Sequence, residues 1–80
     1  MKRDVLFFVD SPVGMVWLRY HTEQSSRIQL MRDEEGLGSY HSASAAANAA
    51  ATGATSSDAV NTLPPGTIPA AIERWQRGPL

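Results

Sequence analysis

Three segments in the first half of the chain carry the patterns of hydrophobic and polar positions that are typical of β-strands. Val5–Val9 is a β-branched and aromatic run, and the residues at 10–14 that follow it are typical of a turn. Met15–His21 alternates in apolar character, and Arg27–Arg32 alternates again in the matching phase. These patterns predict an antiparallel meander of three strands within residues 1–35.

The composition changes after the meander. Glycines at 36 and 38 interrupt any strand, and from Ser42 to Ala54 the chain is almost entirely alanine with a few Ser, Asn and Thr residues. Alanine is the best helix former, so we predict a helix over 39–54 that begins at a cap residue, Ser42 or Ser44, and ends near Gly53. A flexible linker is the alternative interpretation, but linkers rich in Gly and Ser lack alanine runs of this kind.

The last quarter of the chain predicts a loop and a second helix. Residues 55–66 are polar and rich in turn residues, and they end in Leu63-Pro64-Pro65-Gly66. A helix is expected over 67–78, with Thr67 as its cap, Pro69 in its first turn and Gly78 as its stop signal. Its apolar stripe is formed by Ile68, Ala71, Ile72 and Trp75.

Together these elements predict one small α+β domain over residues 1–80, in which a three-stranded antiparallel sheet is packed by two helices. A chain of 80 residues buries roughly 60% of its surface, so its stability is marginal, and association into a homodimer is one way to add to it. The expected core consists of Val5, Phe7, Val9, Val16, Leu18, Tyr20, Ile28, Leu30, Ile72 and Trp75.

Charge and composition narrow the function classes. The 7 Lys+Arg residues against 8 Asp+Glu give a net charge of -1, which argues against a dedicated nucleic-acid binder. The chain has no cysteine and only 2 histidines, so we expect no disulfide, metal or other cofactor. The apolar run Val5–Val9 is too short for a signal peptide, and no segment is long enough to cross a membrane. These features predict a cytoplasmic protein without a membrane partner.

Candidate catalytic groups are few. Ser39 lacks the G-x-S-x-G turn that activates a nucleophilic serine, and His21 and His41 are the only candidate bases. The stretch Gly36–His41 contains a G-x-G, but it lacks the third glycine and the lysine of nucleotide-binding loops and therefore favours a plain turn. We predict that the protein is not an enzyme.

Candidate binding residues come from two places. Trp17, Arg19, Arg27 and Met31 fall on one side of the predicted hairpin, and their types are enriched at interfaces. The alternative is that a helix covers this side and that Trp17 belongs to the core. The acidic run Asp33-Glu34-Glu35 is either a solvated loop or a charge-complementary contact with a basic partner.

The order of these elements resembles that of the small anti-CRISPR proteins of phages and related mobile elements. The resemblance rests on the meander Val5 to Arg32, the acidic residues 33–35, the alanine-rich Ser42 to Ala54 and a short closing helix. It implies a non-enzymatic inhibitor that binds a protein subunit of a Cascade-type CRISPR effector in the host cytoplasm and blocks access to target DNA.

Two other function classes fit the same residues. A small nucleic-acid-binding or transcription-regulating protein would use the same arginines on a phosphate backbone. A structural or assembly protein would use the alanine-rich helix for self-association.

Overall fold

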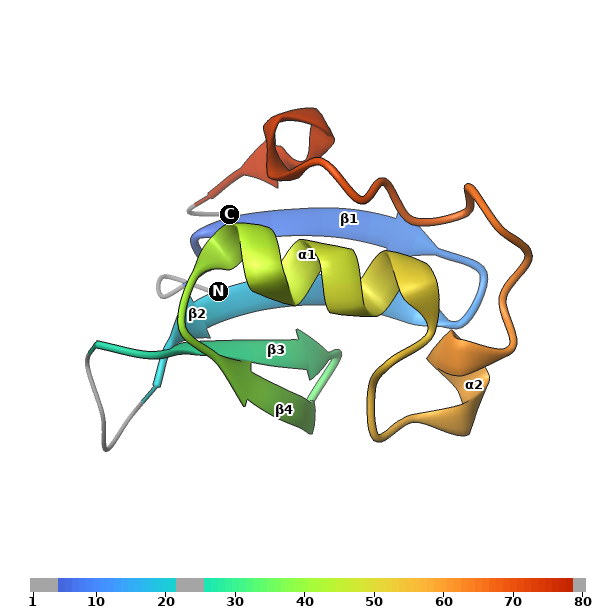
Figure 1. The fold of residues 1–80 in the computed structure, drawn as a ribbon, viewed down its shortest axis with the longest axis horizontal. Coiled ribbons are helices and arrows are strands. Elements are labelled where there is room, and N and C mark those ends of the chain that lie inside the picture. Colours follow the sequence, from blue (N-terminus) through green and yellow to red (C-terminus); the bar gives the residue numbers. More distant parts are fainter. Residues whose placement is uncertain (1–4, 22–25, 79–80) are drawn as a thin grey trace.

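The computed structural model describes residues 5–21 and 26–78 as a small α+β fold (Figure 1). The five strands are β1 (Phe7–Ser11), β2 (Gly14–Tyr20), β3 (Ile28–Arg32), β4 (Glu35–Tyr40) and β5 (Gln76–Arg77). They form one sheet in the order β4-β3-β2-β1-β5, in which all neighbours are antiparallel. The prediction of an antiparallel sheet is confirmed, but the predicted number of three strands is wrong.

Strand β4 occupies a stretch where the sequence analysis expects glycines to end the sheet. Leu30 pairs with Gly38 and Met31 with Gly36, so Leu37 is an extra residue between the two pairs and forms a β-bulge. The Leu37 side chain is only 2% exposed and lies in the core. Gly38 has a φ of +150°, which L side chains rarely adopt, so the two glycines shape this bulge and do not form a nucleotide-binding loop.

Helix α1 (Ala43–Thr52) confirms a helix in the alanine-rich segment, but it is shorter than the predicted 39–54, because Ser39 and Tyr40 pair with β3 as part of β4. It lies across one face of the sheet, where it packs against β3 and β4 (Figure 1). The Ser42 hydroxyl accepts a hydrogen bond from the Ala45 N–H at 3.1 Å and caps the first turn. Gly53 ends the helix, and its N–H donates to the Ala49 carbonyl. Methyl side chains let the helix approach the sheet closely, and Ala46, Ala47, Ala49 and Ala50 are buried.

The helix predicted over 67–78 is absent. In its place the chain forms turns, the three-residue 3-10 helix η1 (Ile72–Arg74) and strand β5. Thr67 does not cap a helix, because its hydroxyl donates to the Pro64 carbonyl at 2.7 Å and closes a turn. The second helix, α2 (Asp58–Asn61), lies instead in the predicted loop over 55–66 and is capped by the Ser57 hydroxyl. Among the described residues, no helix is long and apolar enough to span a membrane.

The core divides into two clusters on opposite faces of the sheet. The larger one lies under α1 and joins the sheet to the helices and the C-terminal segment through Val16, Leu18, Ile28, Leu30, Leu37, Ala46, Ala47, Ala50, Val60, Ile68 and Trp75. Most of the predicted core residues are buried or packed against a cluster, but Tyr20 is 60% exposed. The pairing of β1 with β2 reaches only as far as Leu18, so β1 gives Tyr20 no neighbour on that side.

Candidate functional site

The second face of the sheet carries most of the residues that the sequence analysis selected for binding. The pairing places Trp17 between Phe8 and Met31, and Arg19 opposite Gln29. Residues that pair across neighbouring strands point to the same face, and this face lies away from the core cluster under α1. We call it the outer face and define it by Phe8, Asp10, Met15, Trp17, Arg19, Arg27, Gln29, Met31, Asp33 and Ser39.

The centre of the outer face is a small apolar cluster. Trp17 is 2% exposed and Met31 5% exposed, and they pack with Val5, Phe8 and Met15. The Trp17 indole N–H donates to the Asp33 carbonyl at 2.8 Å, which satisfies the one polar atom of the ring. Trp17 and Met31 therefore hold the sheet and its turn together and present almost no surface to a partner.

Two arginines lie at one end of the outer face and are held in defined orientations. Arg19 Nε donates to Gln29 Oε1 at 2.8 Å, and its guanidinium lies 5.6 Å from the centroid of the Trp17 ring. Arg27 Nε donates to the Ser39 hydroxyl at 2.7 Å, and its Nη2 donates to the Ser39 carbonyl at 3.0 Å. Both side chains are half-buried, so these contacts fix the planes of two cations that solvent still reaches.

Arg27 also protects the edge of the sheet. Strand β4 is the last strand on its side, where backbone carbonyls are open to pairing with another chain. The Leu37 carbonyl accepts from the N–H and the hydroxyl of Ser56 at 3.3 Å and 3.0 Å, and the Ser39 carbonyl accepts from Arg27. Two carbonyls of β4 are therefore engaged within the molecule.

The acidic turn lies at the opposite end of the outer face, but Glu35 pairs with Arg32, which stands opposite the core residue Val16, so Glu35 belongs to the helix side of the sheet. Asp33 and Glu34 form the turn between β3 and β4, and Asp33, Glu34 and Glu35 are all exposed. Arg32 forms an ion pair with Glu35 at 3.2 Å. Asp10, which stands opposite Met15, adds a further exposed carboxylate.

Asp33 also stabilises the fold, because it forms hydrogen bonds with the backbone of Met15. Its carboxylate Oδ1 accepts a hydrogen bond from the Met15 N–H at 3.1 Å, and its own N–H donates to the Met15 carbonyl at 2.8 Å. A Cβ at Gly14 would collide with Oδ2 of the same carboxylate, so the turn between β1 and β2 requires glycine there. The Asp33 side chain thus joins two hairpins, and the sequence analysis did not anticipate this role.

The outer face is therefore dipolar. From Arg19 to Met15, which contacts Asp33, the strand advances four residues, or about 13 Å. A cationic end and an anionic end are thus separated by a packed apolar centre.

The candidate catalytic residues lie at the ends of two strands of the sheet. The Ser39 hydroxyl accepts from Arg27, and His21 and His41 each follow a strand end. In the part of the chain that the structure describes, no group of three or more His, Cys, Asp or Glu residues could hold a metal ion.

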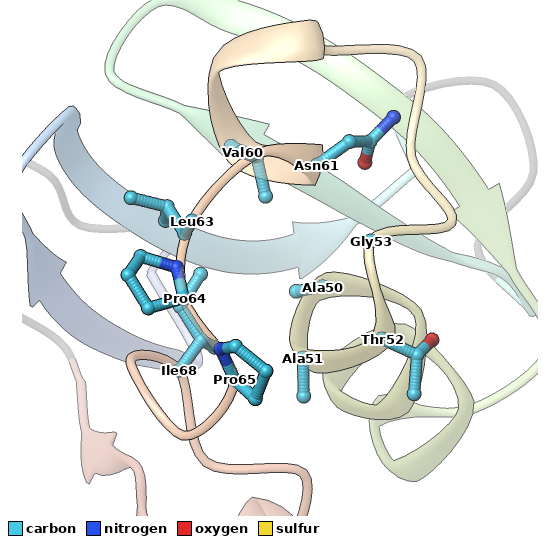
Figure 2. A pocket seen from close by; sticks show the side chains of 10 residues that line it. All are labelled: Ala50, Ala51, Thr52, Gly53, Val60, Asn61, Leu63, Pro64, Pro65 and Ile68. Atoms are coloured by element: carbon cyan, nitrogen blue, oxygen red, sulfur yellow. The ribbon is translucent and has the colours of Figure 1, made fainter.

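A hollow that sequence reasoning missed lies at the C-terminal end of α1 (Figure 2). It has a volume of about 450 Å³, and its walls come from the end of α1, from α2 and from the loop that follows α2. The lining residues are Ala50, Ala51, Thr52, Gly53, Val60, Asn61, Leu63, Pro64, Pro65 and Ile68. The signal in the sequence is a run of small side chains followed by Leu63-Pro64-Pro65-Gly66, because the stiff prolines keep the loop from closing over the alanines.

No family model matches the chain, and neither a curated protein nor a solved structure matches it either.

Proposed function

We propose that the protein is a small non-enzymatic binding protein that docks on a larger protein partner through the outer face of its sheet. The observation that carries the proposal is the dipolar arrangement of charge on this face, with Arg19 and Arg27 at one end and Asp10 and Asp33 at the other. Electrostatic complementarity of this kind sets the orientation of docking and raises the association rate.

The proposed contact is built before the partner arrives. Arg19 is held by Gln29, and Arg27 is held by Ser39, so neither arginine loses its full rotamer freedom on binding. The buried cluster around Trp17 fixes the strands beneath the charges. A chain of 80 residues can present one interface of about 800 Å² per partner.

The dipolar face also favours a protein over a nucleic acid as the partner. A phosphate backbone presents negative charge along its whole length and would be repelled by Asp10, Asp33 and the neighbouring turn. A protein surface with an acidic patch and a basic patch would complement both ends.

The resemblance described above supplies a specific partner for this proposal, a protein subunit of a CRISPR effector in the cytoplasm of the host. Docking there would obstruct the access of target DNA without any chemical step. The identity of the partner and the use of the outer face are separate parts of the proposal.

Charge reversal tests the face. Wild-type protein and the Arg19→Glu, Asp10→Arg and Arg77→Glu variants are immobilised, and proteins retained from a nuclease-treated bacterial lysate are quantified by mass spectrometry. Arg77 is the matched control, because it pairs with Phe7 and packs over the Phe7 ring, which belongs to the cluster under α1. We expect a partner that wild type and Arg77→Glu retain and that both outer-face variants lose. Equal retention by all four proteins would contradict the use of this face.

The specific partner is tested with purified effector complex and labelled target DNA. Adding the protein is expected to abolish the shifted DNA band of the effector, and Arg19→Glu is expected to restore it. If the effector still binds its target, the CRISPR partner is wrong whatever the lysate experiment shows. Direct binding of the protein to DNA at low salt, lost in Arg19→Ala, would favour the nucleic-acid alternative.

A further inference from the structure

A second hollow adjoins the first on the helix side of the sheet, at a distance from the outer face. It has a volume of about 500 Å³ and shares Ala51, Thr52, Pro65 and Ile68 with the hollow in Figure 2. From there it continues past Pro69, Ala70 and Ala71 to Arg74. The two hollows form one groove between the C-terminal half of α1 and the segment 60–74, and we call it the α1 groove.

The half of the α1 groove that Figure 2 shows is apolar and has few groups that could orient a ligand by hydrogen bonds. Asn61 is engaged with Thr55 through both its side-chain oxygen and its nitrogen, and the Thr52 hydroxyl donates to the Asn48 carbonyl. The remaining side chains there are methyl, aliphatic or proline groups. This half therefore suits small aliphatic side chains.

Arg74 is the one charged residue that lines the groove within residues 5–21 and 26–78. It is exposed, and no described carboxylate forms an ion pair with its guanidinium. Glu73, its neighbour in η1, does not line the groove. The charge of the groove therefore complements a single acidic group placed next to an aliphatic stretch.

The exposed rim of the groove indicates that its ligand is a segment of a larger molecule and not a small molecule. Thr52, Pro64, Pro65, Gly66, Ala70, Ala71 and Arg74 are all exposed, so a small ligand would keep much of its surface in water. Small-molecule sites usually bury most of the ligand. A peptide segment in an open groove can bind with less of its surface buried, because the rest of the partner protein adds contacts outside the groove.

We propose that the α1 groove docks an extended peptide segment of a partner protein, in which small aliphatic side chains occupy the hollow near Ala50 and Ile68 and a carboxylate pairs with Arg74. This surface is additional to the outer face, and its use does not depend on the function proposed for that face.

The test selects ligands from a display library of short random peptides against the full-length protein. Selected peptides are synthesised with a fluorescent label, and their affinities are measured by fluorescence anisotropy. We expect them to carry an Asp, a Glu or a free C-terminal carboxylate next to small aliphatic residues. Replacing that acid by its amide is expected to weaken binding about two- to fivefold, as for an exposed ion pair.

Variants of the protein then locate the bound peptide. Arg74→Gln is expected to weaken the binding of the acidic peptide by the same factor and to leave the binding of the amide peptide unchanged. Arg77 is an exposed arginine outside the groove, so Arg77→Gln is expected to change the affinity of neither peptide. Ala51→Leu fills the region that both hollows share, and leucine is well tolerated in a helix, so we expect at least a tenfold loss of binding with an unchanged urea midpoint.

Four results of the ligand-binding experiments would overturn the proposal. They are the absence of enriched peptides, enriched peptides without an acidic group, peptide binding that Ala51→Leu leaves unchanged, and octanoate binding in the groove as tightly as the selected peptides. Self-association of the wild type that Ala51→Leu abolishes would also overturn it, because the occupant would then be a second copy of the chain.

Discussion

Removing the Asp33 carboxylate separates a structural role of the acidic turn from a role in binding alone. Asp33 has a φ of 49°, in the left-handed region that Asp and Asn tolerate better than Ala, and its Oδ1 accepts from the Met15 N–H at 3.1 Å. The hydrogen bond is exposed, so we assign it about 0.5–1 kcal/mol. The left-handed conformation adds about 1 kcal/mol for alanine. We therefore expect Asp33→Ala to lower the free energy of unfolding by about 1.5–2 kcal/mol.

Two further variants separate the two contributions. Asp33→Asn keeps an acceptor oxygen and the tolerance for positive φ, so we expect a loss below about 0.5 kcal/mol. Asp33→Gly keeps only the tolerance for positive φ, and we expect a loss of about 1 kcal/mol, between the other two. Asp10→Ala is the matched control, because Asp10 is an exposed aspartate of the same face, and it should stay within about 0.5 kcal/mol of wild type.

Urea unfolding followed by tryptophan fluorescence measures these differences. Domains of this size have a total stability of about 4–12 kcal/mol, so all four variants should remain folded in water. With a slope of about 1 kcal/mol/M, Asp33→Ala should lower the midpoint by about 1.5–2 M. A midpoint for Asp33→Ala equal to that of Asp10→Ala would refute the structural role and leave Asp33 as a surface charge.

Three other substitutions test the contacts around the outer face. Gly14→Ala should cost more than about 2 kcal/mol in urea unfolding, because its φ is +125° and its Cβ would collide with the Asp33 carboxylate; wild-type stability would mean that the two turns do not meet as described. Trp17→Phe removes the indole hydrogen bond and some packing and should cost about 1–2 kcal/mol, and no change in midpoint would argue that the ring is not buried. Arg27→Ala leaves a carbonyl of β4 open at the edge of the sheet and should raise the mass in sedimentation velocity with increasing concentration, whereas Arg77→Ala should sediment as wild type does.

The elements that the sequence predicts well are those with a local signal. The alternation in β2 and β3 and the alanine run of α1 each specify one type of element over several consecutive residues. Strand β4 has no such signal, because Glu35, Gly36 and Gly38 are poor strand formers. Its conformation depends on pairing with β3 and on the burial of Leu37, which are contacts between distant residues.

The segment 67–78 shows that one spacing of apolar residues is compatible both with a helix and with a chain of turns. Ile68 and Trp75 are buried, as the apolar stripe requires, at 3% and 4% exposure. They reach the core from a chain of turns, and the Trp75 indole N–H donates to the Pro69 carbonyl at 2.8 Å. The spacing of the apolar residues predicted the burial of Ile68 and Trp75, but Ala71 of the same stripe is exposed, and the chain between them is not the predicted helix.

The sequence predicts which candidate binding residues share a face of the sheet, but it does not predict how exposed each side chain is. Alternation alone puts Trp17, Arg19 and Met31 on one face, and the pairing of β2 with β3 agrees. The burial of Trp17 follows from Val5, Phe8 and the Asp33 carbonyl, which come from other segments of the chain. Whether this face binds a partner stays a prediction.

The two apolar clusters explain how so short a chain can offer two separate surfaces. With one packed face, strands β1 to β3 would be supported only from the helix side, by the α1 alanines, which each bury little area, and by Val60, Ile68 and Trp75. The cluster around Trp17 supports the same strands from the other side, so the arginines and the acidic turn are attached to backbone that is packed on both faces. The small side chains of α1 meanwhile leave room for the groove that ends at Arg74. Because Arg19 lies on the outer face and Arg74 lines a groove on the helix side of the sheet, substitutions at these two positions should act independently on the two surfaces.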